Sequence, residues 1–139
     1  MASLRGLCMF GNLAEVQAAL ARGEDVNSKD SDGITALMWA VMYKHNSIVK
    51  LLLDQPAVDV NVKKDNGWTA LHRAAGNNNA EGARMLLQHK DFNSANVTDN
   101  KSNTALMIAV IHRKGEVLRE LVRHLYVSLD VGRLERDQR

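Results

Sequence analysis

The sequence predicts an all-α solenoid of about four helix–turn–helix repeats with β-turn tips. A short motif recurs three times along the 139 residues, and its threonines, Thr35, Thr69 and Thr104, lie 34 and 35 residues apart. The chain has one proline and abundant leucine and alanine, which favours helices over strands. No single copy carries enough apolar surface for a core of its own, so each copy must bury its surface against the next.

Each copy opens with a turn that is followed by a helix. An Asp-Gly or Asn-Gly pair marks the turn at Gly33 and Gly67. The threonine two residues later is a good N-cap for the next helix, so helices are expected to begin at Ala36, Ala70 and Ala105. Small residues within these helices would let neighbouring repeats approach closely.

A second, leucine-rich helix completes each copy after a polar or glycine-containing break. The breaks lie at residues 44–47, 77–79 and 113–115, the leucine-rich segments at 49–53, 83–87 and 118–122, and a third marker, Asp-Val-Asn or a variant of it, at 25–27, 59–61 and 94–96. Because the three markers keep a constant phase, the unit is predicted to be a helix hairpin plus a turn.

These residues resemble ankyrin repeats. The resemblance rests on Gly33-x-Thr35-Ala36-Leu37, on Gly67-x-Thr69-Ala70-Leu71-His72-x-Ala74-Ala75 and on the later markers. It implies an ankyrin repeat domain over residues 1–131, with repeats at about 1–29, 30–63, 64–98 and 99–131, followed by a charged tail at 132–139. It also implies that the inner helices and turn tips form a concave binding face.

The sequence departs from the family pattern at several positions. Ser102 stands where glycine is usual, so the last turn is expected to be less sharply set. Met38 and Met107 replace the common histidine, which leaves a Thr-to-His hydrogen bond in only one repeat, at His72. Alanine also stands where proline is usual at the start of each inner helix. Two glycines in the third repeat, Gly76 and Gly82, each cost a helix about 1 kcal/mol relative to alanine, which makes this repeat the expected soft spot.

The residue pattern favours no enzyme, cofactor or metal site. The five histidines never occur at the His-x-x-x-His spacing, and Cys8 is the only cysteine. We expect Cys8 to be a buried structural thiol and His72 to be a satisfied structural histidine. His45 and His89 are expected to be solvated residues in loops or at helix ends. A net charge of +2 and the absence of a long apolar run make a membrane partner unexpected and a nucleic-acid partner improbable. An intracellular, cytoplasmic location is expected, with the nucleus as the alternative.

The resemblance instead directs attention to the concave face. Mapping the repeat onto the family places an unusual share of aromatic residues there, and clustered Trp, Tyr and Met are typical of interface anchors. The predicted partner-binding residues are Phe10, Asp32, Ile34, Trp39, Tyr43, Asp65, Asn66, Trp68, Arg73, Lys101, Ile108 and His112. The chain is therefore predicted to be a protein-interaction module or adaptor that binds a protein or peptide carrying an apolar segment.

Two further hypotheses follow from the same residues. A nucleic-acid-contacting repeat would stack bases on the aromatic residues and use Lys63, Lys64, Arg73 and Arg113 for phosphates. Separately, the last helix, expected from residue 116 to about residue 127, is more apolar than contact on one side requires. This end is predicted to continue into further repeats or to pack against another molecule, including a second copy. The alternative is that Tyr126 and Leu129 fold back beneath the last hairpin.

Overall fold

The computed structural model describes the backbone of residues 3–137 and the side chains as far as residue 126. Within this part of the chain the structure consists of helices and turns, as an all-α repeat solenoid requires. The helices are α1 (Leu4–Phe10), α2 (Leu13–Ala21), α3 (Ala36–Met42), α4 (Asn46–Leu53), α5 (Ala70–Gly76), α6 (Ala80–Gln88), α7 (Ala105–Ile111) and α8 (Gly115–Asp137).

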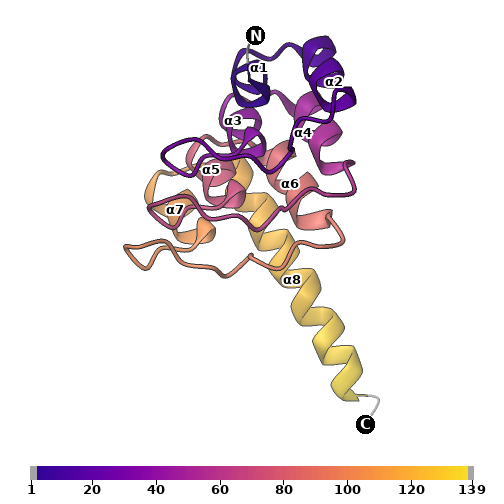
Figure 1. Cartoon of the computed structure of the whole chain (residues 1–139). Helices are drawn as coiled ribbons and strands as arrows, with labels where there is room; N and C mark the ends of the chain where they lie inside the picture. The colour runs from indigo at the N-terminus through magenta and orange to yellow at the C-terminus, as the bar shows by residue number, and fades with distance from the viewer. Residues whose placement is uncertain (1–2, 138–139) are drawn as a thin grey trace.

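The helices form two stacked rows (Figure 1). The inner row is α1, α3, α5 and α7, and the outer row is α2, α4, α6 and α8. Each inner helix also packs against the outer helix that follows it in the chain, which makes four hairpins. The core lies between the rows and between neighbouring hairpins, and it contains Val41, Leu52, Leu71 and Leu86, all fully buried. Each hairpin therefore buries its apolar surface against the neighbouring hairpins.

Threonine caps set the start of three inner helices, as predicted. The hydroxyl oxygens of Thr35, Thr69 and Thr104 each accept a hydrogen bond from the backbone N–H three residues later. At Thr69 the ring of His72 also accepts a hydrogen bond from the threonine's own N–H, which completes a capping box. Methionine takes this place in the other two repeats, so the Thr–His hydrogen bond occurs once in the described residues, as the sequence indicated.

The predicted β-turn tips are present before α3, α5 and α7. In each tip the backbone N–H of the fourth turn residue donates to the carbonyl of the first. The donor and acceptor are Gly33 and Asp30 in the first tip, Gly67 and Lys64 in the second, and Ser102 and Asp99 in the third. The three residues at the turn's end all have positive φ, including Ser102 at 64°. Ser102 therefore adopts the left-handed geometry of the glycines despite its Cβ, so the last turn keeps the geometry of the others.

Side-chain and backbone hydrogen bonds join successive repeats along the loops. The Asn27 amide donates to the carbonyl of Ala57 and accepts from the N–H of Asp59. Asn61, one repeat later, donates to the carbonyl of Asp91 and accepts from the N–H of Asn93. The asparagine of the third marker is thus a bridge between neighbouring loops, which explains its regular spacing.

The last helix is longer than predicted. We expected it to end near residue 127 and residues 132–139 to form a separate charged tail, but α8 continues to Asp137. The final two residues lie outside the described part of the chain. No proline interrupts the segment, and Leu, Arg and Glu are good helix formers, so the single glycine at Gly132 costs only about 1 kcal/mol. The prediction followed the apolar residues, whose pattern becomes charged after about residue 131. The backbone stays helical beyond that point, to Asp137.

Candidate functional site

The turn tips present four of the predicted partner-binding residues to solvent. Asp32, Asp65, Asn66 and Lys101 are all exposed. Backbone hydrogen bonds hold the tips in a row, because the N–H of Asp65 donates to the carbonyl of Asp32 at 3.2 Å and that of Asn100 donates to the carbonyl of Asn66 at 2.9 Å. We call the surface made by these tips and the inner helices the inner face. The rim of the inner face is polar, and the hydrogen bonds between successive repeats fix the spacing of the turn tips along it.

Two predicted aromatic residues form a ladder on α3. Trp39 and Tyr43 lie one helical turn apart, and their rings stack with centroids 6.0 Å apart and planes inclined by 7°. Tyr43 stacks in turn on His45, with centroids 6.2 Å apart. Trp39 is half-buried and Tyr43 is exposed. Trp39 packs against the core on one side, while the exposed ring of Tyr43 extends the ladder as a flat aromatic surface open to solvent.

Trp68 is held in place by the next repeat. Its indole Nε1–H donates to Asp99 Oδ2 at 2.9 Å, and its ring stacks on His72 with centroids 6.0 Å apart. A Cβ added at Gly76 would come within 3.3 Å of the indole ring. The absence of a side chain at Gly76 therefore leaves the space that the indole occupies, and Trp68 is fixed on three sides.

Arg73 completes this group. Its guanidinium carbon lies 5.2 Å from the centroid of the Trp68 ring, within cation–π range. Burial lowers the pKa of Arg73 from its ordinary value, and the neighbouring Tyr43 raises it. We call Trp39, Tyr43, Trp68 and Arg73 the aromatic–arginine cluster. Residues from two neighbouring repeats meet in it, and all four were predicted as partner-binding.

The remaining predicted residues stand apart from this cluster. Phe10 and His112 are exposed at the ends of α1 and α7. Ile34 and Ile108 are buried in the core, so the structure removes them from the accessible surface. The repeat register placed both isoleucines on the inner face, but both side chains belong to the buried hydrophobic core. Their apolar side chains contribute to stability instead.

Two side chains that could take part in chemistry, Cys8 and His72, have structural roles instead, as expected. Cys8 is fully buried, and burial raises its pKa to about 12, so the thiol is not a nucleophile near neutral pH. His72 is fully buried too, and its Nε2–H donates to the carbonyl of Asn103 at 2.9 Å while Nδ1 accepts from the N–H of Thr69. Burial is the main cause that lowers the pKa of His72 below its ordinary value.

His45 and His89 lie at helix ends, as the sequence predicted, but the prediction that both are solvated is wrong. Both rings are half-buried, and each bonds a carbonyl of the preceding repeat at 3.1 Å: His45 bonds that of Met9 and His89 that of Leu53. Asp99 was missed altogether, although it holds Trp68. A spacing of about one repeat between bonded residues is the signal that could have found all three.

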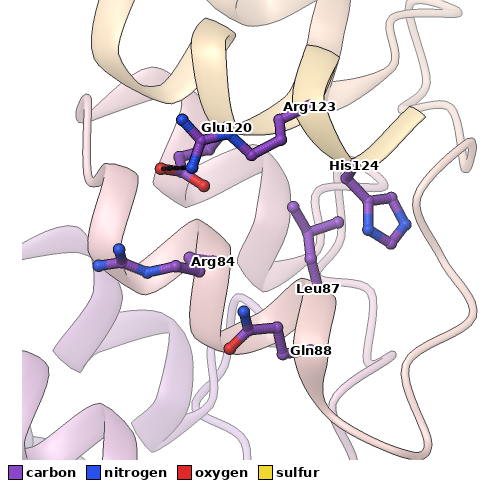
Figure 2. Close-up of a pocket in the computed structure, with 6 residues that line it drawn as sticks. All are labelled: Arg84, Leu87, Gln88, Glu120, Arg123 and His124. Atoms are coloured by element: carbon purple, nitrogen blue, oxygen red, sulfur yellow. Dashed lines mark ion pairs between the residues drawn. The ribbon is translucent and has the colours of Figure 1, made fainter. Parts of the chain in front are cut away.

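A pocket of about 250 Å³ lies between the two outer helices α6 and α8. Figure 2 shows the side chains that line it. Its lining includes Arg84, Leu87 and the ion pair between Glu120 and Arg123, whose charged atoms are 4.0 Å apart. A pocket at the same repeat positions lies between α4 and α6. Because the hollow recurs with the repeat, it is a consequence of helix stacking and does not by itself mark a site.

The C-terminal end of the stack exposes an apolar surface. It consists of Met107, Val110 and Ile111 on α7 and Val122 and Tyr126 on α8, all exposed, and we call it the C-terminal end face. Val117 and Leu121 on the same outer helix are buried. Tyr126 does not fold back beneath the last hairpin, while the side chain of Leu129 lies outside the described residues. Association at this end stays a prediction.

No group of three or more His, Cys, Asp or Glu side chains in the described part of the chain is arranged to hold a metal ion. Over the same residues, no helix combines the length and the apolar character needed to cross a membrane.

Comparison with known proteins identifies the repeat. A family model described as ankyrin repeats in three copies matches residues 4–96 and 57–133. Human Rabankyrin-5 is 32% identical over 95 residues, which is 68% of this chain and 8% of that protein. The putative ankyrin repeat protein FPV031 of fowlpox virus is 31% identical over 112 residues, which is 78% of this chain and 32% of the viral protein. The chain thus spans a small part of the relatives that it matches.

Proposed function

The chain belongs to the ankyrin repeat family, whose repeats generally mediate protein–protein interaction, and we propose that it binds a partner protein or peptide on its inner face. The aromatic–arginine cluster is the proposed anchor, and the exposed tip residues form the polar rim. We propose a binding module or adaptor rather than an enzyme. The partner's contact segment is proposed to be apolar in part, because aromatic rings make up most of the anchor.

One observation carries this proposal. Trp39 stacks on Tyr43, Arg73 lies over Trp68, and Tyr43 interacts electrostatically with Arg73, which links the two pairs across two repeats; parts of all four side chains remain accessible. A side chain that served only the core would be fully buried, as that of Leu71 is. Interfaces concentrate Trp, Tyr and Arg at their energetic centres, so this combination supports a protein partner.

The test is a selection of peptides from a random display library on the immobilised protein. Peptides that bind should lose about 1 kcal/mol or more of affinity when Tyr43 is replaced by alanine, because truncation of an interface anchor commonly costs this much. Tyr43 is exposed, so Tyr43→Ala is expected to keep the thermal stability of the wild type. The matched control is Tyr126→Ala, which removes an exposed tyrosine from the C-terminal end face.

The results separate the alternatives. Peptides whose affinity falls with Tyr43→Ala and not with Tyr126→Ala would support the proposal. Peptides that bind both variants as tightly as the wild type would contradict it. A short single-stranded oligonucleotide that binds through Tyr43, with affinity falling steeply as salt is added, would instead support the nucleic-acid hypothesis.

A further inference from the structure

Arg73 is a half-buried cation without a counter-ion in the described part of the chain. The ion pairs there are Arg22–Glu24 and Glu120–Arg123, and neither includes it. Its Nε is a buried donor with no hydrogen-bond acceptor. Burial of a charge is costly unless the charge is paired, and the half-buried guanidinium has a cation–π contact with Trp68 but no carboxylate partner among the described residues.

The surroundings of Arg73 hold its guanidinium ready for an incoming group. The group lies over Trp68, and Trp68 is itself fixed by the 2.9 Å hydrogen bond to Asp99. Asp99, the acid that holds Trp68, is already engaged: it accepts hydrogen bonds from the indole and from the N–H groups of Lys101 and Asn103. A partner that pairs with Arg73 need not first order the side chain, which lowers the entropic cost of binding.

The charge and number of groups favour a carboxylate. Arginine binds planar carboxylates through paired N–H donors. Tyr43 interacts electrostatically with Arg73, and Trp39 stacks on Tyr43, so these two rings offer a nearby surface for an apolar side chain. Recognition of a phosphate dianion usually employs several arginines, and the aromatic–arginine cluster contains one. An acidic residue next to an apolar residue would satisfy both parts of the cluster.

Resting on the proposed function, we propose that Arg73 binds the carboxylate of an Asp or Glu in the partner peptide, beside an apolar residue that packs on Tyr43 and Trp39. The ligand class is thus a peptide with an acidic–apolar pair. Trp68 and Asp99 are positioning residues, since they orient Arg73 and do not contact the carboxylate.

The experiment uses the peptides selected on the wild-type protein. They should share an Asp or Glu at one position, and its replacement by the matching amide should weaken binding about tenfold. Arg73→Glu should weaken binding of the acidic peptide by at least this factor, and a peptide with Lys at that position should recover it. Arg84→Glu, an equal charge reversal at an exposed site on α6, is the matched control and should change neither affinity.

The outcomes distinguish this inference from the proposed function. Peptides that need Tyr43 but contain no fixed acid, or whose amide versions bind equally well, would overturn the carboxylate proposal and leave the interface standing. Peptides that do not need Tyr43 would refute both. If Arg73→Glu lowers the melting temperature, recovery of binding by the Lys peptide still decides the matter, because an unfolded variant cannot show it.

Discussion

The two ends of the stack face solvent with very different surfaces. At the C-terminal end, three apolar side chains are about half exposed: Met107 at 47%, Val110 at 56% and Val122 at 51%. The residues at the same helix positions two repeats earlier are covered by the following repeat: Met38 at 1%, Val41 at 0% and Leu53 at 8%. The last repeat therefore keeps the residue types of an internal repeat without the neighbour.

The N-terminal end is different because its outer helix, α2, carries a polar residue at a position that is apolar in α4 and α8. The third residue of the outer helix is Ile48 in α4 and Val117 in α8, both buried, whereas it is Glu15 in α2 and exposed. Gln17 and Ala18 are exposed on the same helix. Terminal repeats of solenoids usually present polar outer faces, and the outer helix of the N-terminal repeat follows this pattern more closely than the C-terminal end face does, although Phe10, at the helix position of Ile111, is exposed as well.

The comparison is sharpest at the turn glycines, where we expect the largest effects. A Cβ at Gly67 would lie 2.9 Å from the Cα of Asp99 in the next tip, and φ at Gly67 is 84°. Gly67→Ser therefore combines a clash with left-handed strain and should lower the free energy of unfolding by about 2–3 kcal/mol. Urea denaturation measures the change.

Ser102 is the matched position in the last tip, where no described repeat follows. The reverse change, Ser102→Gly, relieves the strain of a positive φ and should raise the free energy of unfolding by about 0.5–1 kcal/mol. A loss of stability in Ser102→Gly would show that Ser102 makes contacts that compensate for its strained backbone.

Two valines at the sixth position of their inner helices provide the next test. Val41→Ala removes two methyl groups from the core and should cost about 2 kcal/mol, since buried methyl groups contribute by transfer and by packing. Val110→Ala should change the free energy of unfolding by less than about 0.5 kcal/mol, because the side chain is half exposed already. Equal losses in the two variants, measured by thermal or urea denaturation, would mean that Val110 is covered in solution.

A smaller effect is expected at His72, whose ring bonds the following repeat. His72→Met imitates the residues of the other repeats and should cost about 1 kcal/mol at pH 7 through the lost hydrogen bonds. Met107→His is the control. It should gain nothing comparable, because the described structure has no following repeat to supply a carbonyl.

The cost of His72→Met should also depend on pH. The pKa of His72 is lower in the folded protein than the ordinary value of 6.5, so below pH 6.5 the unfolded chain binds the proton more readily. Wild-type stability should fall as the pH drops from 7 to 5, and the gap between wild type and His72→Met should narrow. A constant gap in urea denaturation across this range would contradict the role assigned to the neutral ring.

The repeat period and local chemistry were enough to predict much of this fold. The inner helices begin at Ala36, Ala70 and Ala105 because the preceding threonine accepts a hydrogen bond from the N–H three residues after it. This interaction is local, so the sequence predicts it. The burial of Ile34 and Ile108 depends on the packing around them, and the repeat register alone does not determine this. The contact between Asp99 and Trp68 likewise depends on how one repeat is positioned against the next, which the sequence does not specify.

The glycines of the third repeat illustrate the same limit. Sequence alone assigned Gly76 and Gly82 a cost in helix propensity. In the structure, a Cβ at Gly82 would lie 2.5 Å from the amide of Asn79, whose Nδ2 donates to the carbonyl of Val41, and Gly76 leaves room for Trp68. Both glycines therefore have a packing role, and the idea that this repeat is the least stable stays a prediction.

The smallest effect on stability is expected at the C-terminal end face, where the expected change is in association. The exposed apolar residues there were predicted from the sequence to pack against another molecule, and a second copy is the case that can be tested with the pure protein. Sedimentation of the wild type should then become faster as the concentration rises. Val110→Lys should abolish this dependence with little change in the free energy of unfolding, because a charge on each copy opposes burial of the face. Gln17→Lys adds the same charge at the N-terminal end and should leave association unchanged. A wild type that sediments as a monomer at all concentrations would show that a second copy does not cover this face.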